Sequence, residues 1–136
     1  MIKEVLLPSG NKAMIGDPAF EDVLELQEYI ARNANNIPAE AFSSGLGEDI
    51  VSLIKFLPSL IENKEFRAIV FKCGAKCKIK RPNGDMVDFE MAYFNAPEAR
   101  PDYFVLIKEV VEFSLLPLFK GLRAVSLKDL FKKMGG

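Results

Sequence analysis

Residues 2–18 of the chain read Ile2-Lys3-Glu4-Val5-Leu6-Leu7-Pro8-Ser9-Gly10-Asn11-Lys12-Ala13-Met14-Ile15-Gly16-Asp17-Pro18. The apolar runs 2–7 and 12–15 flank a cluster of turn-forming residues, and this pattern predicts two strands joined by a tight turn. Asp17 suits the cap of a helix whose first turn holds Pro18, because a proline there gives up no hydrogen bond. The segment therefore predicts an N-terminal β-hairpin that leads into a helix.

The composition is that of a folded protein with few routes to catalysis. The chain has 136 residues, of which 49% are hydrophobic and 27% charged, and this predicts a single domain over residues 1–136. The net charge of −1 gives no overall bias toward nucleic acid or membrane. Because the chain contains no histidine, it lacks Ser-His-Asp and Cys-His catalysis and the commonest zinc ligand.

No segment reads as a membrane span or a secretion signal. The most apolar stretch, residues 104–122, carries four charged residues: Lys108, Glu109, Glu112 and Lys120. The first residues resemble a strand rather than a signal peptide. We therefore expect a cytoplasmic protein.

Hydrophobic periodicity predicts helices over much of the chain. The first covers residues 18–33, with an apolar face made of Phe20, Val23, Leu24, Leu26, Tyr29 and Ile30. Shorter helices are expected over residues 38–43 and 48–57. A long helix runs from Pro101 to Leu122, with a kink at Pro117 and a C-terminal cap at Gly121, after a loop over residues 96–100. A short terminal helix covers Ser126–Met134, where Ser126 and Asp129 resemble a capping box.

Between these helices the period falls toward two. Residues 66–71 predict a strand, and residues 76–81 and 86–91 predict a second hairpin around Pro82-Asn83-Gly84-Asp85. The fold class is therefore α+β: an N-terminal β-hairpin, several helices, a central β-hairpin, a long C-terminal helix and a short terminal helix.

A basic cluster over residues 72–81 lies on and just before the first strand of the central hairpin. Its members are Lys72, Lys76, Lys78, Lys80 and Arg81. A loop of Asn83-Gly84-Asp85 would set Lys80 opposite Asp88 and Lys78 opposite Glu90, so that the lysines are largely neutralised across the strands. A solvated, salt-paired face is the favoured interpretation, and a nucleic-acid contact surface is the alternative.

Other candidate chemistries find little support. Cys73 and Cys77 lack the further ligands of a zinc site, and we expect two reduced, partly buried cysteines. The carboxylates of residues 17–25 and 85–90 are expected to serve caps and solvated faces. The sequence thus predicts no catalytic, cofactor or metal site, and no enzyme.

The long helix is apolar on nearly every side, so it must be buried in a core or against partners. An ordinary core helix is the favoured interpretation, and self-association stays open as the alternative. The candidate partner-binding residues are Phe104, Ile107, Val111, Leu115, Leu118, Leu127, Leu130 and Phe131.

The opening segment also carries a family resemblance. Val5-Leu6-Leu7-Pro8-Ser9-Gly10, a short second strand, and Asp17-Pro18 before an acidic helix resemble the start of phage tail assembly chaperones. The segment is also similar to the start of some small baseplate-hub proteins of contractile tails. The resemblance ends with that helix.

The resemblance implies a non-enzymatic protein that binds the tape-measure protein or other tail and baseplate proteins and shields apolar helices. It would act in the host cytoplasm, without a cofactor, and a homo-oligomer is possible. One alternative is a structural baseplate or tail component that stays in the virion tail. A second alternative is a small nucleic-acid-binding regulator that uses the basic residues 72–81.

Overall fold

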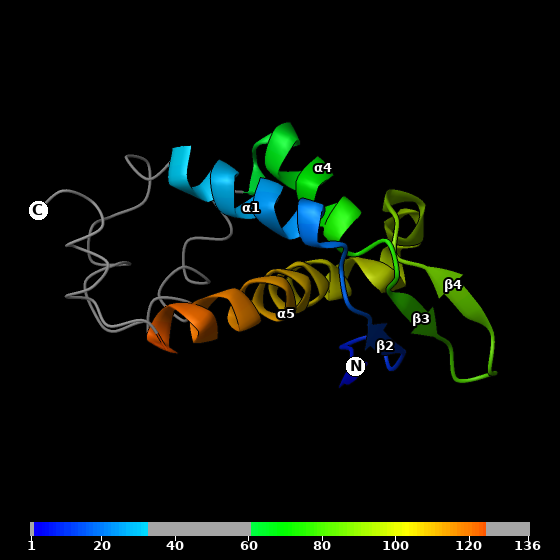
Figure 1. Ribbon diagram of the computed structural model, residues 1–136. Helices are drawn as coiled ribbons and strands as arrows, with labels where there is room; N and C mark the ends of the chain where they lie inside the picture. Colours follow the sequence, from blue (N-terminus) through cyan, green and yellow to red (C-terminus); the bar gives the residue numbers. More distant parts are fainter. Residues whose placement is uncertain (1, 33–60, 125–136) are drawn as a thin grey trace, which may run out of the picture.

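The computed structural model describes residues 2–32 and 61–124 and shows an α+β protein (Figure 1). The elements, in chain order, are β1 (Lys3–Leu6), β2 (Lys12–Ile15), α1 (Phe20–Arg32), α4 (Lys64–Cys73), β3 (Lys78–Lys80), β4 (Met86–Asp88), the 3-10 helices η3 (Met91–Asn95) and η4 (Pro97–Asp102), and α5 (Tyr103–Ala124). In Figure 1, α1 and α4 lie side by side along α5, and the strands lie beside the first half of α5.

Both predicted hairpins are confirmed, and they join into one antiparallel sheet. The strand order is β1-β2-β3-β4, with β2 paired to β3. One row across the sheet consists of Val5, Ala13, Ile79 and Val87, and these side chains contribute to the core. The pairing of the two hairpins was not part of the sequence prediction.

The two hairpin loops, residues 8–10 and 82–84, have the same geometry. In both, the N–H of the residue before the loop donates to the carbonyl oxygen of the residue after it, at 2.8 Å. The glycine that ends each loop, Gly10 or Gly84, has a φ of +95° or +96°. This left-handed conformation favours glycine, and proline suits the first loop position. The Pro-x-Gly sequence therefore sets both loops at three residues.

The loop length corrects the predicted register of the second hairpin. Because the loop is Pro82-Asn83-Gly84, Lys78 faces Asp88 and Lys80 faces Met86. The predicted pairs Lys80–Asp88 and Lys78–Glu90 are therefore wrong. The strands are also shorter than predicted, and the chain enters η3 at Met91.

Residues 66–71 were predicted as a strand but lie inside α4. The buried side chains of α4 are Phe66, Ile69, Val70 and Cys73, which recur at helical spacing and form one face. The side chain of Asn63 caps this helix by accepting hydrogen bonds from the N–H groups of Glu65 and Phe66. Tertiary burial and the cap thus outweigh the strand preference of a short apolar run.

The other helices depart from the prediction mainly at their ends. Helix α1 begins at Phe20, two residues later than predicted, and α5 begins at Tyr103. The predicted loop over residues 96–100 lies largely within η4. Because α5 continues through Pro117 to Ala124, Gly121 lies inside the helix and does not cap it.

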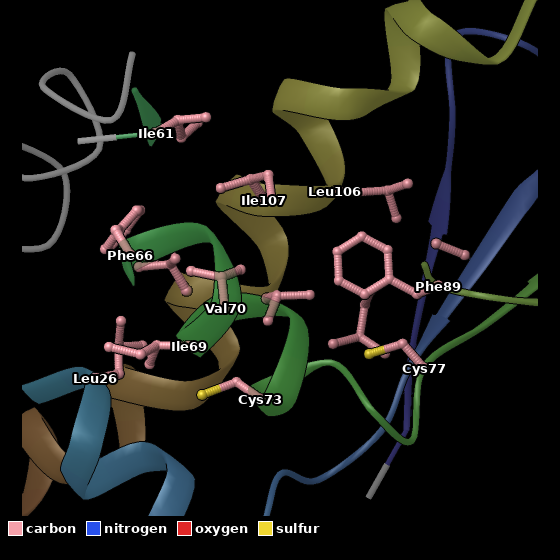
Figure 2. Packing of buried hydrophobic residues seen from close by; sticks show 14 of the residues in the cluster. Leu26, Ile61, Phe66, Ile69, Val70, Cys73, Cys77, Phe89, Leu106 and Ile107 are labelled. Carbon is pink, nitrogen blue, oxygen red and sulfur yellow. The ribbon is translucent and has the colours of Figure 1, made fainter. Parts of the chain in front are cut away.

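Helix α5 is the central core helix, as the favoured interpretation predicted. Its buried apolar side chains are Leu106, Ile107, Val110, Val111 and Leu115. Figure 2 shows Leu26 of α1, Phe66 of α4 and Ile107 of α5 within the same buried cluster. On α1, Phe20 and Leu24 belong to the predicted apolar face but are exposed. The other members of that face are buried in the core: Val23, Leu26, Tyr29 and Ile30.

Some predicted elements lie outside the described residues. They are the helices over 38–43 and 48–57 and the terminal helix over 126–134, which contains Leu127, Leu130 and Phe131. Among the helices of residues 2–32 and 61–124, none combines the length and the apolar character that a membrane crossing requires.

Candidate partner-binding site

The predicted partner-binding residues of α5 separate into two groups. Ile107, Val111 and Leu115 are at most 1% exposed, so they belong to the core and form no surface. Phe104 is 56% exposed, and Leu118 is half-buried beside a hollow of about 300 Å³ that Phe20 also lines. Of the predicted partner-binding residues in the described part of α5, Phe104 and Leu118 therefore remain available to a partner.

An open groove of about 770 Å³ lies between α4 and the segment that follows β4. From α4 it is lined by Lys64, Arg67, Phe71 and Lys72, and from the other side by Glu90 and Met91. Positions 64, 67 and 71 are three or four residues apart, so together with the adjacent Lys72 they form one continuous helix face. We call this feature the α4 groove.

The floor of the α4 groove is aromatic. The half-buried ring of Phe71 stacks on the buried ring of Phe89, with centroids 4.6 Å apart and planes inclined by 19°. Gly74 makes room for this arrangement, because a Cβ atom there would lie 2.4 Å from the Phe89 ring. At the edge of the floor, Met91 is 55% exposed. The apolar floor of the groove is thus positioned by the close packing of the Gly74 backbone against the ring of Phe89.

The two walls of the α4 groove differ in charge. The α4 wall carries Lys64, Arg67 and Lys72, whereas the opposite wall carries Glu90 together with the ion pair of Asp88 and Lys78. The asymmetry favours a ligand with negative groups on one side and positive groups on the other.

Two of the lysines at the groove already have partners. Lys72 donates to Glu25 of α1, and this hydrogen bond raises the pKa of Lys72. Lys78 forms an ion pair with Asp88. Lys64 and Arg67 carry no ion pair with another described side chain, so the α4 wall retains positive charge there.

A second polar site connects the first hairpin loop to the start of α5. Asp102 is fully buried, and its Oδ1 accepts from the N–H of Ser9 at 2.9 Å. Its Oδ2 accepts from the hydroxyls of Ser9 and Tyr93, both at 2.6 Å. The Tyr93 hydroxyl in turn accepts from the side-chain amide of Asn11 at 2.9 Å. We call these four residues the Asp102 clamp.

The Asp102 clamp has the character of a structural element. Its carboxylate has three donors, which satisfies a buried charge that would otherwise be costly. Burial raises the pKa of Tyr93, and the hydrogen bond to Asp102 raises it further. A raised pKa keeps this hydroxyl protonated, as its role as a donor requires.

Both cysteines are free and buried, which confirms the sequence prediction (Figure 2). The Cys73 thiol lies 3.4 Å from the carbonyl oxygen of Asp22. Burial raises the pKa of Cys73 to about 11, and burial also raises the pKa of Cys77. Thiols of this kind are not activated nucleophiles at neutral pH. Among the described residues, no three acidic or cysteine side chains are grouped so that they could hold a metal ion.

The basic cluster is only partly neutralised. Lys80 faces Met86 on one side and Lys12 of β2 on the other, so two lysines lie directly opposite on the outer face of the sheet. This pair could not be predicted from the local sequence, because it depends on the pairing of β2 with β3. The α4 groove was not predicted either, because residues 66–71 fit the pattern of a strand. The helical spacing of residues 64, 67, 71 and 75 was the signal that could have identified the groove wall.

Comparison with known proteins adds no relative: no protein-family model, no curated protein and no solved structure matches the chain.

Proposed function

We propose that the protein is a non-enzymatic assembly chaperone of the phage-tail kind, which binds the tape-measure protein or other tail components. The observation that carries the proposal is the α4 groove, an open apolar floor between charged walls. Grooves of this kind receive the apolar face of an amphipathic helix. The proposed binding surface is therefore the outer face of α4, because the predicted α5 residues Ile107, Val111 and Leu115 are buried.

The opening hairpin supports the same proposal. Its Leu-Pro-Ser-Gly turn carries the resemblance to tail assembly chaperones, and this turn is held by the Asp102 clamp. The exposed Phe104 adds a further apolar contact site near the start of α5. A chaperone of this kind acts in the host cytoplasm and shields apolar helices until they assemble.

Co-expression tests the proposal. The tagged full-length chain is produced together with the tape-measure protein encoded in the same genome, and the complex is recovered by affinity purification. We expect the two proteins to co-purify and the tape-measure protein to remain in the soluble fraction. No affinity for the tape-measure protein or for any tail component would refute the proposal.

Mass spectrometry of purified particles separates a chaperone from a structural baseplate or tail component. A chaperone leaves before the virion is complete, so we expect no peptides of this chain in finished particles. Its presence there at a fixed copy number would favour the structural alternative.

The opposed lysines Lys12 and Lys80 favour a second candidate, a nucleic-acid-binding regulator. Like charges directly opposite in a sheet are unfavourable unless an anion lies between them. A gel shift that weakens with salt and is lost on Lys80→Glu would support this candidate, and no shift at low salt would exclude it.

A further inference from the structure

We infer that the α4 groove receives an amphipathic helix of a partner protein, with acidic residues along the flank that faces α4 and basic residues along the flank that faces β4. The inference rests on the proposed function and deepens it, since it assigns the partner's chemistry and orientation. Three features of the groove carry it: its length, its floor and the charges of its walls.

The length of the groove suits a helix of a few turns. Its helical wall extends from Lys64 to Lys72, and Ala75 lies two residues beyond the end of α4. At 1.5 Å per residue the helical part is roughly 12 Å long, or about two helical turns. The exposed small side chains of Ala68 and Ala75 permit a close approach along that wall.

The floor provides two apolar contacts of different character. Phe71 is fixed by its stacking on Phe89, and it offers a rigid ring face. Met91 is exposed and unbranched, so it adapts to whichever apolar side chain is placed against it. A partner helix with apolar residues at every third or fourth position would cover both side chains.

The walls then determine the orientation of the partner. Lys64 and Arg67 attract carboxylates, and Arg67, whose side chain also interacts with Tyr103, has further guanidinium N–H groups to donate to a carboxylate. On the other side, Glu90 attracts a basic residue, and Asp88 is already paired with Lys78.

The test uses a synthetic peptide as the probe. A fluorescein-labelled helix of about four turns carries leucine at every third or fourth position, glutamate on one flank and lysine on the other. A control peptide keeps the leucines and has lysine on both flanks. By fluorescence anisotropy with the full-length chain, we expect the first peptide to bind at least about tenfold more tightly than the control. Equal affinity, or no binding of the first peptide, would overturn the inference.

Two methionines near the central hairpin provide a matched pair of variants. Met91 lies in the α4 groove, whereas Met86 is 48% exposed in β4 and does not line the groove. We expect Met91→Glu and Arg67→Glu each to weaken peptide binding about tenfold and Met86→Glu to leave it within about twofold. Because all three residues are at least partly exposed, circular dichroism should show unchanged folding. Equal losses for Met91→Glu and Met86→Glu would contradict the assignment.

The same variants separate this inference from the proposed function. If the tape-measure protein co-purifies with Met91→Glu as well as with Met86→Glu, the groove assignment fails and the chaperone proposal stands. If the peptide binds the groove but no tail component is captured, the chaperone proposal fails and the groove assignment stands. If the unmodified chain is a dimer that Met91→Glu converts to a monomer, the groove holds a second copy and the partner-helix inference is overturned.

Discussion

Replacing Asp102 with alanine is expected to destabilise the protein strongly. The carboxylate is fully buried and accepts three hydrogen bonds, two of them at 2.6 Å. Hydrogen bonds to charged groups contribute about 1.5–3 kcal/mol each, and removing the acceptor leaves buried donors unsatisfied. Water entering the new cavity would recover part of that loss. We therefore expect Asp102→Ala to lower the free energy of unfolding by about 4 kcal/mol, which is a large fraction of a typical total of about 5–15 kcal/mol.

Urea unfolding, followed by far-ultraviolet circular dichroism, measures this loss. Asp102→Asn keeps the shape but offers one acceptor oxygen in place of two, so we expect about half the cost of the alanine variant. Ser9→Ala and Tyr93→Phe each remove one hydroxyl donor, and each should cost about 1–2 kcal/mol.

A double-mutant cycle tests the geometry more closely than any single variant. The hydroxyls of Ser9 and Tyr93 both donate to Oδ2 of Asp102, so their effects should couple by at least about 0.5 kcal/mol. If Asp102→Ala costs less than about 1 kcal/mol, or if the two hydroxyl variants are strictly additive, the clamp does not stabilise the fold in the way argued.

Three further predictions concern the core and its charges. Gly74→Ala should cost about 1–3 kcal/mol in urea unfolding, because the new Cβ would overlap the ring of Phe89; an unchanged midpoint would show that the ring moves freely. The free energy of unfolding should fall by about 2–3 kcal/mol as the pH rises from 9 to about 11, because the unfolded chain releases the Cys73 proton at a lower pH than the folded chain does. Unfolding curves at several pH values measure this loss, and Cys73→Ala should make the stability less dependent on pH. Lys3→Met should lower the free energy of unfolding by about 1–2 kcal/mol, since it leaves the nearly buried Glu109 without its 2.8 Å partner. In thermal melts, the double variant Lys3→Met with Glu109→Gln should be more stable than Lys3→Met alone.

The features predicted correctly are those that local chemistry determines. Both hairpins follow from a Pro-x-Gly loop between apolar runs, and the burial of α5 follows from its apolar surface on all sides. The prediction failed where a short segment fits two periods. Residues 66–71 contain isoleucine, valine and two phenylalanines, and the cap at Asn63 that identifies them as helix lies just outside that segment.

Non-local features were out of reach for a different reason. The pairing of β2 with β3 brings Lys12 beside Lys80, and no local pattern encodes it. The α4 groove likewise depends on where Met91 lies relative to α4. The predicted register was wrong by two residues because Gly84 was placed in the middle of the loop. In the structure Gly84 has a φ of +96° and is the last residue of the loop Pro82-Asn83-Gly84.

The Asp102 clamp also imposes an order on folding. Ser9 and Asp102 are 93 positions apart, so during synthesis the first hairpin leaves the ribosome long before its anchor exists. Two strands alone are marginally stable in water, and β3 is also far along the chain. The N-terminal hairpin is thus made first and secured last, and closing this long loop adds entropic cost and slows folding. Until α5 emerges, the apolar residues of β1 and β2 stay accessible in the nascent chain. At this stage the protein itself exposes apolar surface, as do the partner helices that we propose it shields.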